Sequence, residues 1–183
     1  MHANDEMLFA RAQQGDHGAF GQVVQRYQNR LYSVALKILH HPHDAEDATQ
    51  QAFLQAWQKR HLYDPKWHFS TWIYRIVSNV CIDEYRRQQR RQPIADTRLT
   101  ALVAPHSPAH EIERQERCQT VAAALQDVPV EARLVLVLCY MDGLSYAEVA
   151  KIRGISVHTV KSQLRRAKAL LRQRLTPKDK ETI

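Results

Sequence analysis

The most informative part of the sequence is residues 143–175, GLSYAEVAKIRGISVHTVKSQLRRAKALLRQRL. Ser145 and Glu148 have the spacing of a capping box, in which each side chain satisfies a free backbone amide at a helix start. Gly154 permits the left-handed backbone that ends a helix, and Ser156 is a natural cap for the next one. A helix, a short glycine turn and a second helix predict a helix-turn-helix.

Both helices of this motif have an apolar and a polar face. The residues expected to point inward at helical spacing are Tyr146, Val149, Ala150, Ile152, Val157, Val160, Leu164, Ala167 and Leu171. The opposite face of the second helix is basic, and no acidic residue occurs between Glu148 and Asp179. A solvated helix usually mixes charges to gain i,i+4 pairs, so charge of one sign favours contact with DNA phosphates. The alternative is a helical hairpin with a basic, solvated face.

The N-terminal half of a recognition helix contacts base edges in the major groove of DNA. The candidates for base contact are Thr159, Lys161, Ser162 and Arg165, and the candidates for phosphate contact are Arg166 and Lys168. The formal net charge of the whole chain, +7, also suggests a polyanionic partner. An acidic membrane surface, or a merely basic protein surface, would explain this charge as well.

The remaining sequence predicts an all-α protein. Amphipathic helices are expected over residues 16–40, from Asp44 onward and over about 70–91, while period-two alternation is nearly absent. Residues 134–138, LVLVL, are too apolar for a surface helix and should be buried. No run is long and apolar enough for a membrane span, and the polar, acidic N-terminus does not have the pattern of a signal peptide. A cytoplasmic location is therefore expected.

The helices fall into two blocks. Residues 93–110 contain three of the seven prolines and show no helical period, which predicts a flexible linker. We therefore expect two small helical domains, at residues 5–92 and 111–176.

In this order, the two blocks resemble the extracytoplasmic function (ECF) sigma factors of bacteria. The resemblance rests on DAEDATQQAFLQAWQK (44–59), on FSTWIYRIVSNVCIDEYRRQQRR (69–91) and on LSYAEVAKIRGISVHTVKSQLRRAKALL (144–171). These stretches are similar to the family's regions 2.2, 2.3–2.4 and 4. The resemblance implies a sigma region 2 helical bundle and a sigma region 4 helix-turn-helix. It also implies a protein that binds core RNA polymerase and directs promoter-specific transcription initiation.

The resemblance further implies where the polymerase binds. The helix from Asp44 to Lys59 would dock on the clamp helices of the β′ subunit, and the β flap is a second implied contact. Acidic and amide groups beside apolar side chains suit contact with another helix, although an ordinary acidic first turn is the alternative. The implied polymerase-binding residues are Asp44, Glu46, Asp47, Gln50, Gln51, Phe53, Leu54 and Trp57.

Promoter recognition is implied at two places. The recognition helix would bind the upstream (minus thirty-five) element, where His158 and Gln163 replace the glycine and arginine frequent in the family and should alter the sequence recognised. The helix from Phe69 would bind the downstream (minus-ten) element through Trp72, Arg75, Asn79, Arg86 and Arg87. Aromatic faces and polar edges capture unstacked bases, and Trp67, Phe69 and Tyr74 supply further aromatic rings. Trp72 fits a core position as well as a base contact.

The sequence indicates no catalytic or metal chemistry. His40, His41 and His43 form an HHPH cluster without a carboxylate or cysteine at coordinating spacing, so a solvated loop is expected there. Without a phosphate loop or nucleophile motif, we expect neither enzymatic activity nor a cofactor or small-molecule substrate. The resemblance implies one more partner, an anti-sigma factor, often membrane-anchored in this family. The alternative hypothesis is a stand-alone helix-turn-helix regulator that binds its operator without polymerase.

Overall fold

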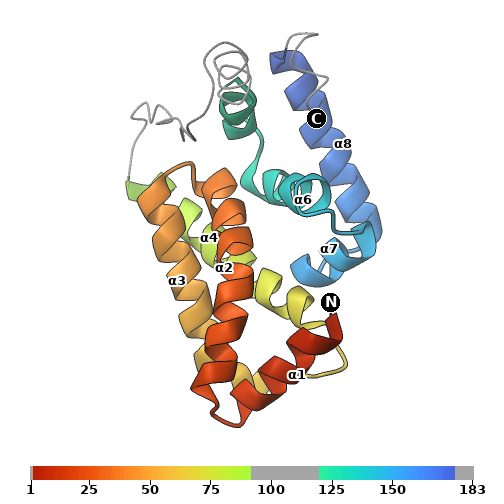
Figure 1. Ribbon diagram of the computed structural model, residues 1–183. Coiled ribbons are helices and arrows are strands. Elements are labelled where there is room, and N and C mark those ends of the chain that lie inside the picture. The colour runs from red at the N-terminus through yellow and green to blue at the C-terminus, as the bar shows by residue number, and fades with distance from the viewer. Residues whose placement is uncertain (1, 92–119, 176–183) are drawn as a thin grey trace, which may run out of the picture.

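The computed structural model describes residues 2–91 and 120–175, and within these ranges every regular element is a helix (Figure 1). The all-α prediction is thus confirmed. The expected linker at 93–110, residues 111–119 of the second expected domain and its last residue lie outside the described ranges. None of the described helices is both long and apolar enough to cross a membrane.

Four helices make up the N-terminal half, namely α1 (His2–Gln13), α2 (His17–Leu39), α3 (Pro42–Gln58) and α4 (Phe69–Arg91), with the short 3-10 helix η1 (Arg60–Leu62) after α3. Asp16 caps α2, because its carboxylate accepts a hydrogen bond of 2.9 Å from the amide of Ala19. Helix α3 begins at Pro42 rather than at Asp44, since a proline fits the first helical position, where no amide partner is needed.

Helix α1, which the sequence analysis did not predict, completes the core of this half. Its Phe9 is fully buried, and its ring centroid lies 5.1 Å from that of Tyr63, 4.5 Å from that of Phe69 and 5.1 Å from that of Trp72. Trp72 is half-buried in the cluster. This aromatic cluster fixes the start of α4 and the segment that follows η1.

The C-terminal half contains a helical segment at 120–126, then α6 (Val130–Tyr140), α7 (Tyr146–Arg153) and α8 (Val157–Arg174). Residues 134–138 are buried, as predicted. The capping box at the start of α7 is present, Gly154 ends that helix with φ of 66°, and Ser156 caps α8. These features confirm the helix-turn-helix, with α8 as its second helix.

The two halves pack on each other, which the sequence analysis did not anticipate (Figure 1). Helix α6 contacts α2 and α4, while α7 lies against α4. The fully buried guanidinium of Arg133 joins them. It donates hydrogen bonds of 2.8 Å to the carbonyl of Ile38, 2.8 Å to that of Gln126 and 3.0 Å to that of Val128, and lies 2.7 Å from Nε2 of His40.

Polar contacts extend this packing around Arg133. Glu131 of α6 accepts a hydrogen bond of 2.7 Å from Arg86 of α4 and one of 2.6 Å from Arg153 of α7. The hydroxyl of Tyr74 on α4 donates to Asp142, beyond the end of α6, over 3.1 Å. The described halves are therefore joined by hydrogen bonds and ion pairs as well as by apolar contact.

Candidate nucleic-acid interface

Helix α8 presents the residues expected at the upstream element to solvent. Lys161, Arg165 and Arg166 are exposed, and Thr159, Ser162 and Lys168 are half-buried. Among residues 2–91 and 120–175, no carboxylate forms an ion pair with any of these four cations, although Arg174 farther along α8 pairs with Asp127. The charge on this face is therefore free to meet an external anion.

The two hydroxyl side chains on α8 are partly engaged by the helix itself. Oγ1 of Thr159 lies 2.8 Å from Oγ of Ser156, and Oγ of Ser162 donates to the carbonyl of Thr159 over 3.0 Å. The lysine and arginine side chains on this face are therefore available to donate hydrogen bonds to DNA. The hydroxyls of Thr159 and Ser162 must first break their present hydrogen bonds before they can contact a base.

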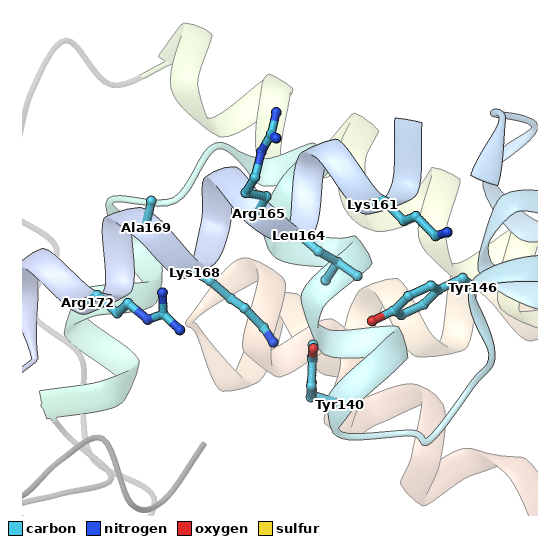
Figure 2. A pocket seen from close by; sticks show the side chains of 8 residues that line it. All are labelled: Tyr140, Tyr146, Lys161, Leu164, Arg165, Lys168, Ala169 and Arg172. Carbon is cyan, nitrogen blue, oxygen red and sulfur yellow. The ribbon is translucent and has the colours of Figure 1, made fainter. Parts of the chain in front are cut away.

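A groove of about 340 Å³ runs beside α8 (Figure 2). Its lining residues are Tyr140, Tyr146, Lys161, Leu164, Arg165, Lys168, Ala169 and Arg172. Tyr146 was expected to point inward, but this expectation is wrong, because 38% of the residue is exposed. Tyr146 is the first residue of α7, and this end of the helix lies outside the core. The same holds for Val157, the first residue of α8, which is 40% exposed.

A second hollow of about 340 Å³ lies between the segment around η1 and α4. The residues that line it are Lys59, Leu62, Asp64, Trp67, Trp72, Arg75, Ile76 and Asn79. Three residues expected at the downstream element, Trp72, Arg75 and Asn79, therefore meet at one place. Its most accessible aromatic ring belongs to Trp67, which is 48% exposed, while Trp72 is held in the aromatic cluster beneath.

Two other residues expected at the downstream element are placed elsewhere. Arg86 pairs with Glu131 across the contact between the halves, and Arg87 pairs with Glu84 on its own helix. Neither arginine lines the hollow. Both remain exposed, so release from these pairs would leave them available to a DNA backbone.

The outward face of α3 carries most of the residues expected to bind polymerase. Glu46, Asp47, Gln50, Gln51 and Leu54 are exposed, and Asp44 is half-buried. Phe53 corrects the expectation, because it is only 8% exposed, with its ring centroid 6.5 Å from that of Phe20, and supports this face from the core. Trp57 is half-buried, with the His17 ring centroid 4.5 Å from its own and the Arg60 guanidinium 4.2 Å from it.

The three neighbouring histidines do not face a common point. Nδ1 of His41 lies 3.5 Å from Asp44, and Nδ1 of His43 lies 3.9 Å from Glu46. His40 turns the opposite way, toward Arg133, and burial beside this cation lowers its pKa to about 4. In the described part of the chain, no three potential ligands gather around a possible metal position.

Comparison with known proteins matches both halves to family models. Residues 23–91 match Sigma-70 region 2, and residues 118–171 match Sigma-70 region 4. The two matches follow each other in the order that the sequence motifs predicted. They define a protein of the sigma-70 class.

Individual relatives narrow this class. The ECF RNA polymerase sigma factor SigW of Bacillus subtilis (strain 168) is 31% identical over 174 residues, which cover 90% of this chain and 93% of the relative. The ECF RNA polymerase sigma-E factor of Escherichia coli (strain K12) is 30% identical over 182 residues, covering 94% and 95%. The chain belongs to the ECF RNA polymerase sigma factors.

A solved structure supports the arrangement of the whole chain. CnrH in complex with the cytosolic domain of CnrY is 29% identical, with a TM-score of 0.71 over 93% of this chain and 96% of that one. The likeness spans both halves of the chain.

Proposed function

We propose that this sigma factor holds two different forms of promoter DNA at two sites while α3 anchors it to core RNA polymerase. The sigma region 2 domain, residues 5–92, would bind polymerase and the downstream element. The region 4 domain, residues 111–176, would bind the upstream element, and residues 93–110 would connect them.

One observation supports this proposal most strongly, namely that the two candidate DNA sites differ in chemistry. The α8 face offers cations that have no carboxylate partner in the described part of the chain, which suits phosphates and base edges of duplex DNA. The hollow beside α4 combines an exposed indole, an amide and a guanidinium, which suit an unstacked base. A factor that both recognises and opens a promoter needs one site of each kind.

In the hollow, we assign a separate role to each of four side chains. The exposed ring of Trp67 would stack on an extruded base, an interaction worth roughly 1–3 kcal/mol. Asn79 would hydrogen-bond to the edge of that base, and Arg75 would hold the adjoining phosphate. Trp72 would make the base of the hollow rigid, because its ring is packed within the aromatic cluster.

The partners follow from the family and the surfaces. The acidic and amide face of α3 would meet the β′ clamp helices, and the region 4 domain would meet the β flap. Because CnrH binds the cytosolic domain of a second protein, we propose a comparable inhibitory partner, an anti-sigma factor, for this chain. Its work with RNA polymerase on promoters would take place in the cytoplasm. The family acts in transcription initiation, so we propose no enzymatic activity, cofactor or small-molecule substrate.

Transcription with purified core polymerase on a genomic template library tests this function. Wild-type protein should yield promoter-dependent transcripts. Arg165→Ala should reduce use of the upstream element, with a loss of about 1–3 kcal/mol of base discrimination where a contact is lost. Gln173→Ala, an exposed change on the same helix, should not.

An absence of any promoter-dependent transcript with the wild-type protein would refute the proposal. The stand-alone regulator makes the opposite prediction, tight binding to an operator without polymerase. A gel shift with and without core enzyme separates these two functions.

A further inference from the structure

We propose that Tyr140 and Tyr146, together with Lys161 and Lys168, form a clamp for one backbone phosphate of the upstream duplex. The inference rests on the proposed function. It adds two tyrosines that the sequence did not indicate for DNA contact, and it gives Lys161 a phosphate in place of the base contact expected from the sequence. We call these four residues the tyrosine–lysine clamp.

The clamp is formed where three helices meet. Tyr140 is the last residue of α6, Tyr146 is the first residue of α7, and both lysines project from α8. Figure 2 shows Tyr140, Tyr146 and Lys168 pointing toward one another, with Lys161 on the far side of Tyr146 and Arg165 turned away. Nζ of Lys168 lies 4.4 Å from the ring centroid of Tyr140. The tyrosines are 39% and 38% exposed, so a ligand can reach them.

The charge of this groove favours an anion. Lys161, Arg165, Lys168 and Arg172 all contribute to its lining, and none of the eight lining residues is acidic. Only two of the eight lining residues are aliphatic, the buried Leu164 and Ala169, although the tyrosine rings also contribute apolar surface. A phosphate fits this composition better than the apolar face of a partner helix does.

The clamp offers several donors to an anion. The contact with Lys168, and to a smaller extent that with Tyr146, lowers the pKa of Tyr140, while the contact with Tyr140 raises the pKa of Tyr146. Each tyrosine carries one hydroxyl group that can donate to an acceptor in the groove. Lys161 supplies further donors.

The position of the clamp matches the DNA backbone rather than the bases. In a helix-turn-helix, the second helix enters the major groove while the first helix crosses the backbone. Tyr146 starts that first helix, and the clamp lies on the flank of α8 between it and the outward base-reading side chains. A phosphate at the groove wall would therefore set how far and at what angle α8 enters.

The test compares the double variant Tyr140→Phe/Tyr146→Phe with wild type in the holoenzyme. The variant loses two hydroxyl groups and keeps both rings and every charge. On a promoter selected by the wild-type holoenzyme, we expect about tenfold weaker binding to the upstream duplex, by an equal factor on sequence variants of the element. Tyr32→Phe, a half-buried change on α2, is the matched control and should bind as wild type.

Single methylphosphonate substitutions, each of which neutralises one phosphate, locate the contact. Wild type should lose most affinity at one backbone position, and the double variant should lose clearly less there. The inference is overturned if the double variant binds as tightly as wild type, if its loss depends on base sequence, or if neutralising each phosphate affects both proteins alike. Failure of wild-type holoenzyme to make promoter-dependent transcripts would instead refute the proposed function.

Discussion

Arg133 is a fully buried cation whose guanidinium is held by backbone carbonyls and by the His40 ring. The Ile38 carbonyl lies near the C-terminal end of α2, where the helix dipole is negative and favours a positive charge. The ring of Tyr85 lies 5.2 Å from the same guanidinium and adds a cation–π contact. Backbone dipoles from both halves of the molecule therefore surround Arg133 in place of the carboxylate that usually pairs with a buried arginine.

The arrangement around Arg133 requires a neutral His40, which makes stability depend on pH. The pKa of His40 is lowered to about 4 from an ordinary value of 6.5, through burial and the nearby Arg133. As the pH falls below 6.5, the unfolded chain takes up this proton first, so we expect a loss of about 3 kcal/mol by pH 4. Chemical denaturation between pH 4 and 7 measures it.

The matched variant is His40→Asn, because asparagine tolerates the left-handed backbone at this position, where φ is 61°. It should have a smaller difference in unfolding free energy between pH 7 and pH 4 than wild type. Equal pH dependence in the two proteins would contradict the assignment to His40.

Asn79 gives a second prediction for a single residue. Asn79→Ala should weaken promoter opening by about 1–3 kcal/mol and leave initial binding nearly unchanged, because in the proposed role its amide would contact a base only after that base leaves the stack. Fluorescence of a reporter base in the downstream element measures opening. Asp83→Ala, exposed on the same helix, should open promoters normally. Wild-type opening by Asn79→Ala would remove the amide from the base-binding role.

Among the helical elements, the turn before α8 depends on one glycine. Gly154 has φ of 66°, and an added Cβ would meet no atom within 4 Å, so the penalty for a side chain comes from the backbone alone. Gly154→Ala should lower the free energy of unfolding by roughly 1–2 kcal/mol. Gly154→Asn should lower it less. Thermal unfolding compares them, and equal melting temperatures for alanine and asparagine would contradict this explanation.

Most elements were predictable because their signals are local. Helix α2, the capping box of α7 and the cap of α8 depend on residues three or four positions apart, which the sequence displays directly. Helix α1 was missed because few apolar residues mark its inner face, and packing of Phe9 against distant rings stabilises it. Tyr146 was misplaced because a helical period does not show where the core ends.

The candidate sites divide in the same way. The basic face of α8 follows from charge pattern alone, whereas the hollow beside α4 joins residues on both sides of η1. The sequence pattern favoured Trp72 over Trp67 as a base contact, but Trp67 is exposed and Trp72 is half-buried, because exposure depends on the aromatic cluster below. Tyr140 carried no sequence signal for DNA contact, since only the fold brings it beside Lys168.

For the whole molecule, the packing of the halves leads to a prediction about shape. Arg133→Ala removes the donor to the carbonyls of Ile38, Gln126 and Val128, and separation of the halves would let water replace the hydrogen bond lost at the buried Ile38 carbonyl. We expect the contact between the halves to weaken by about 2–4 kcal/mol and the radius of gyration in X-ray scattering to increase. Arg172→Ala, exposed on α8, is the control. An unchanged radius for Arg133→Ala would contradict this role.

This packing was not predictable from the sequence. Arg133 lies in an ordinary helical pattern, and the residue types near positions 38 and 128 do not indicate that they contact it. Every residue has a backbone carbonyl, so a contact with one cannot be recognised from residue types or from their spacing. The contacts of Glu131 are equally unpredictable from the sequence, because only the fold brings Arg86 and Arg153 to its two carboxylate oxygens.

The carbonyl cage around Arg133 also determines how the molecule responds to dissolved ions. Mobile ions weaken attraction between charges at the surface, such as Arg86 and Glu131, but they have little access to a sealed guanidinium among fixed peptide groups. A high salt concentration should therefore weaken the ion pairs at the surface of the contact between the two halves but leave the buried part of the contact, around Arg133, intact. A rise in ionic strength alone should therefore leave the two halves together.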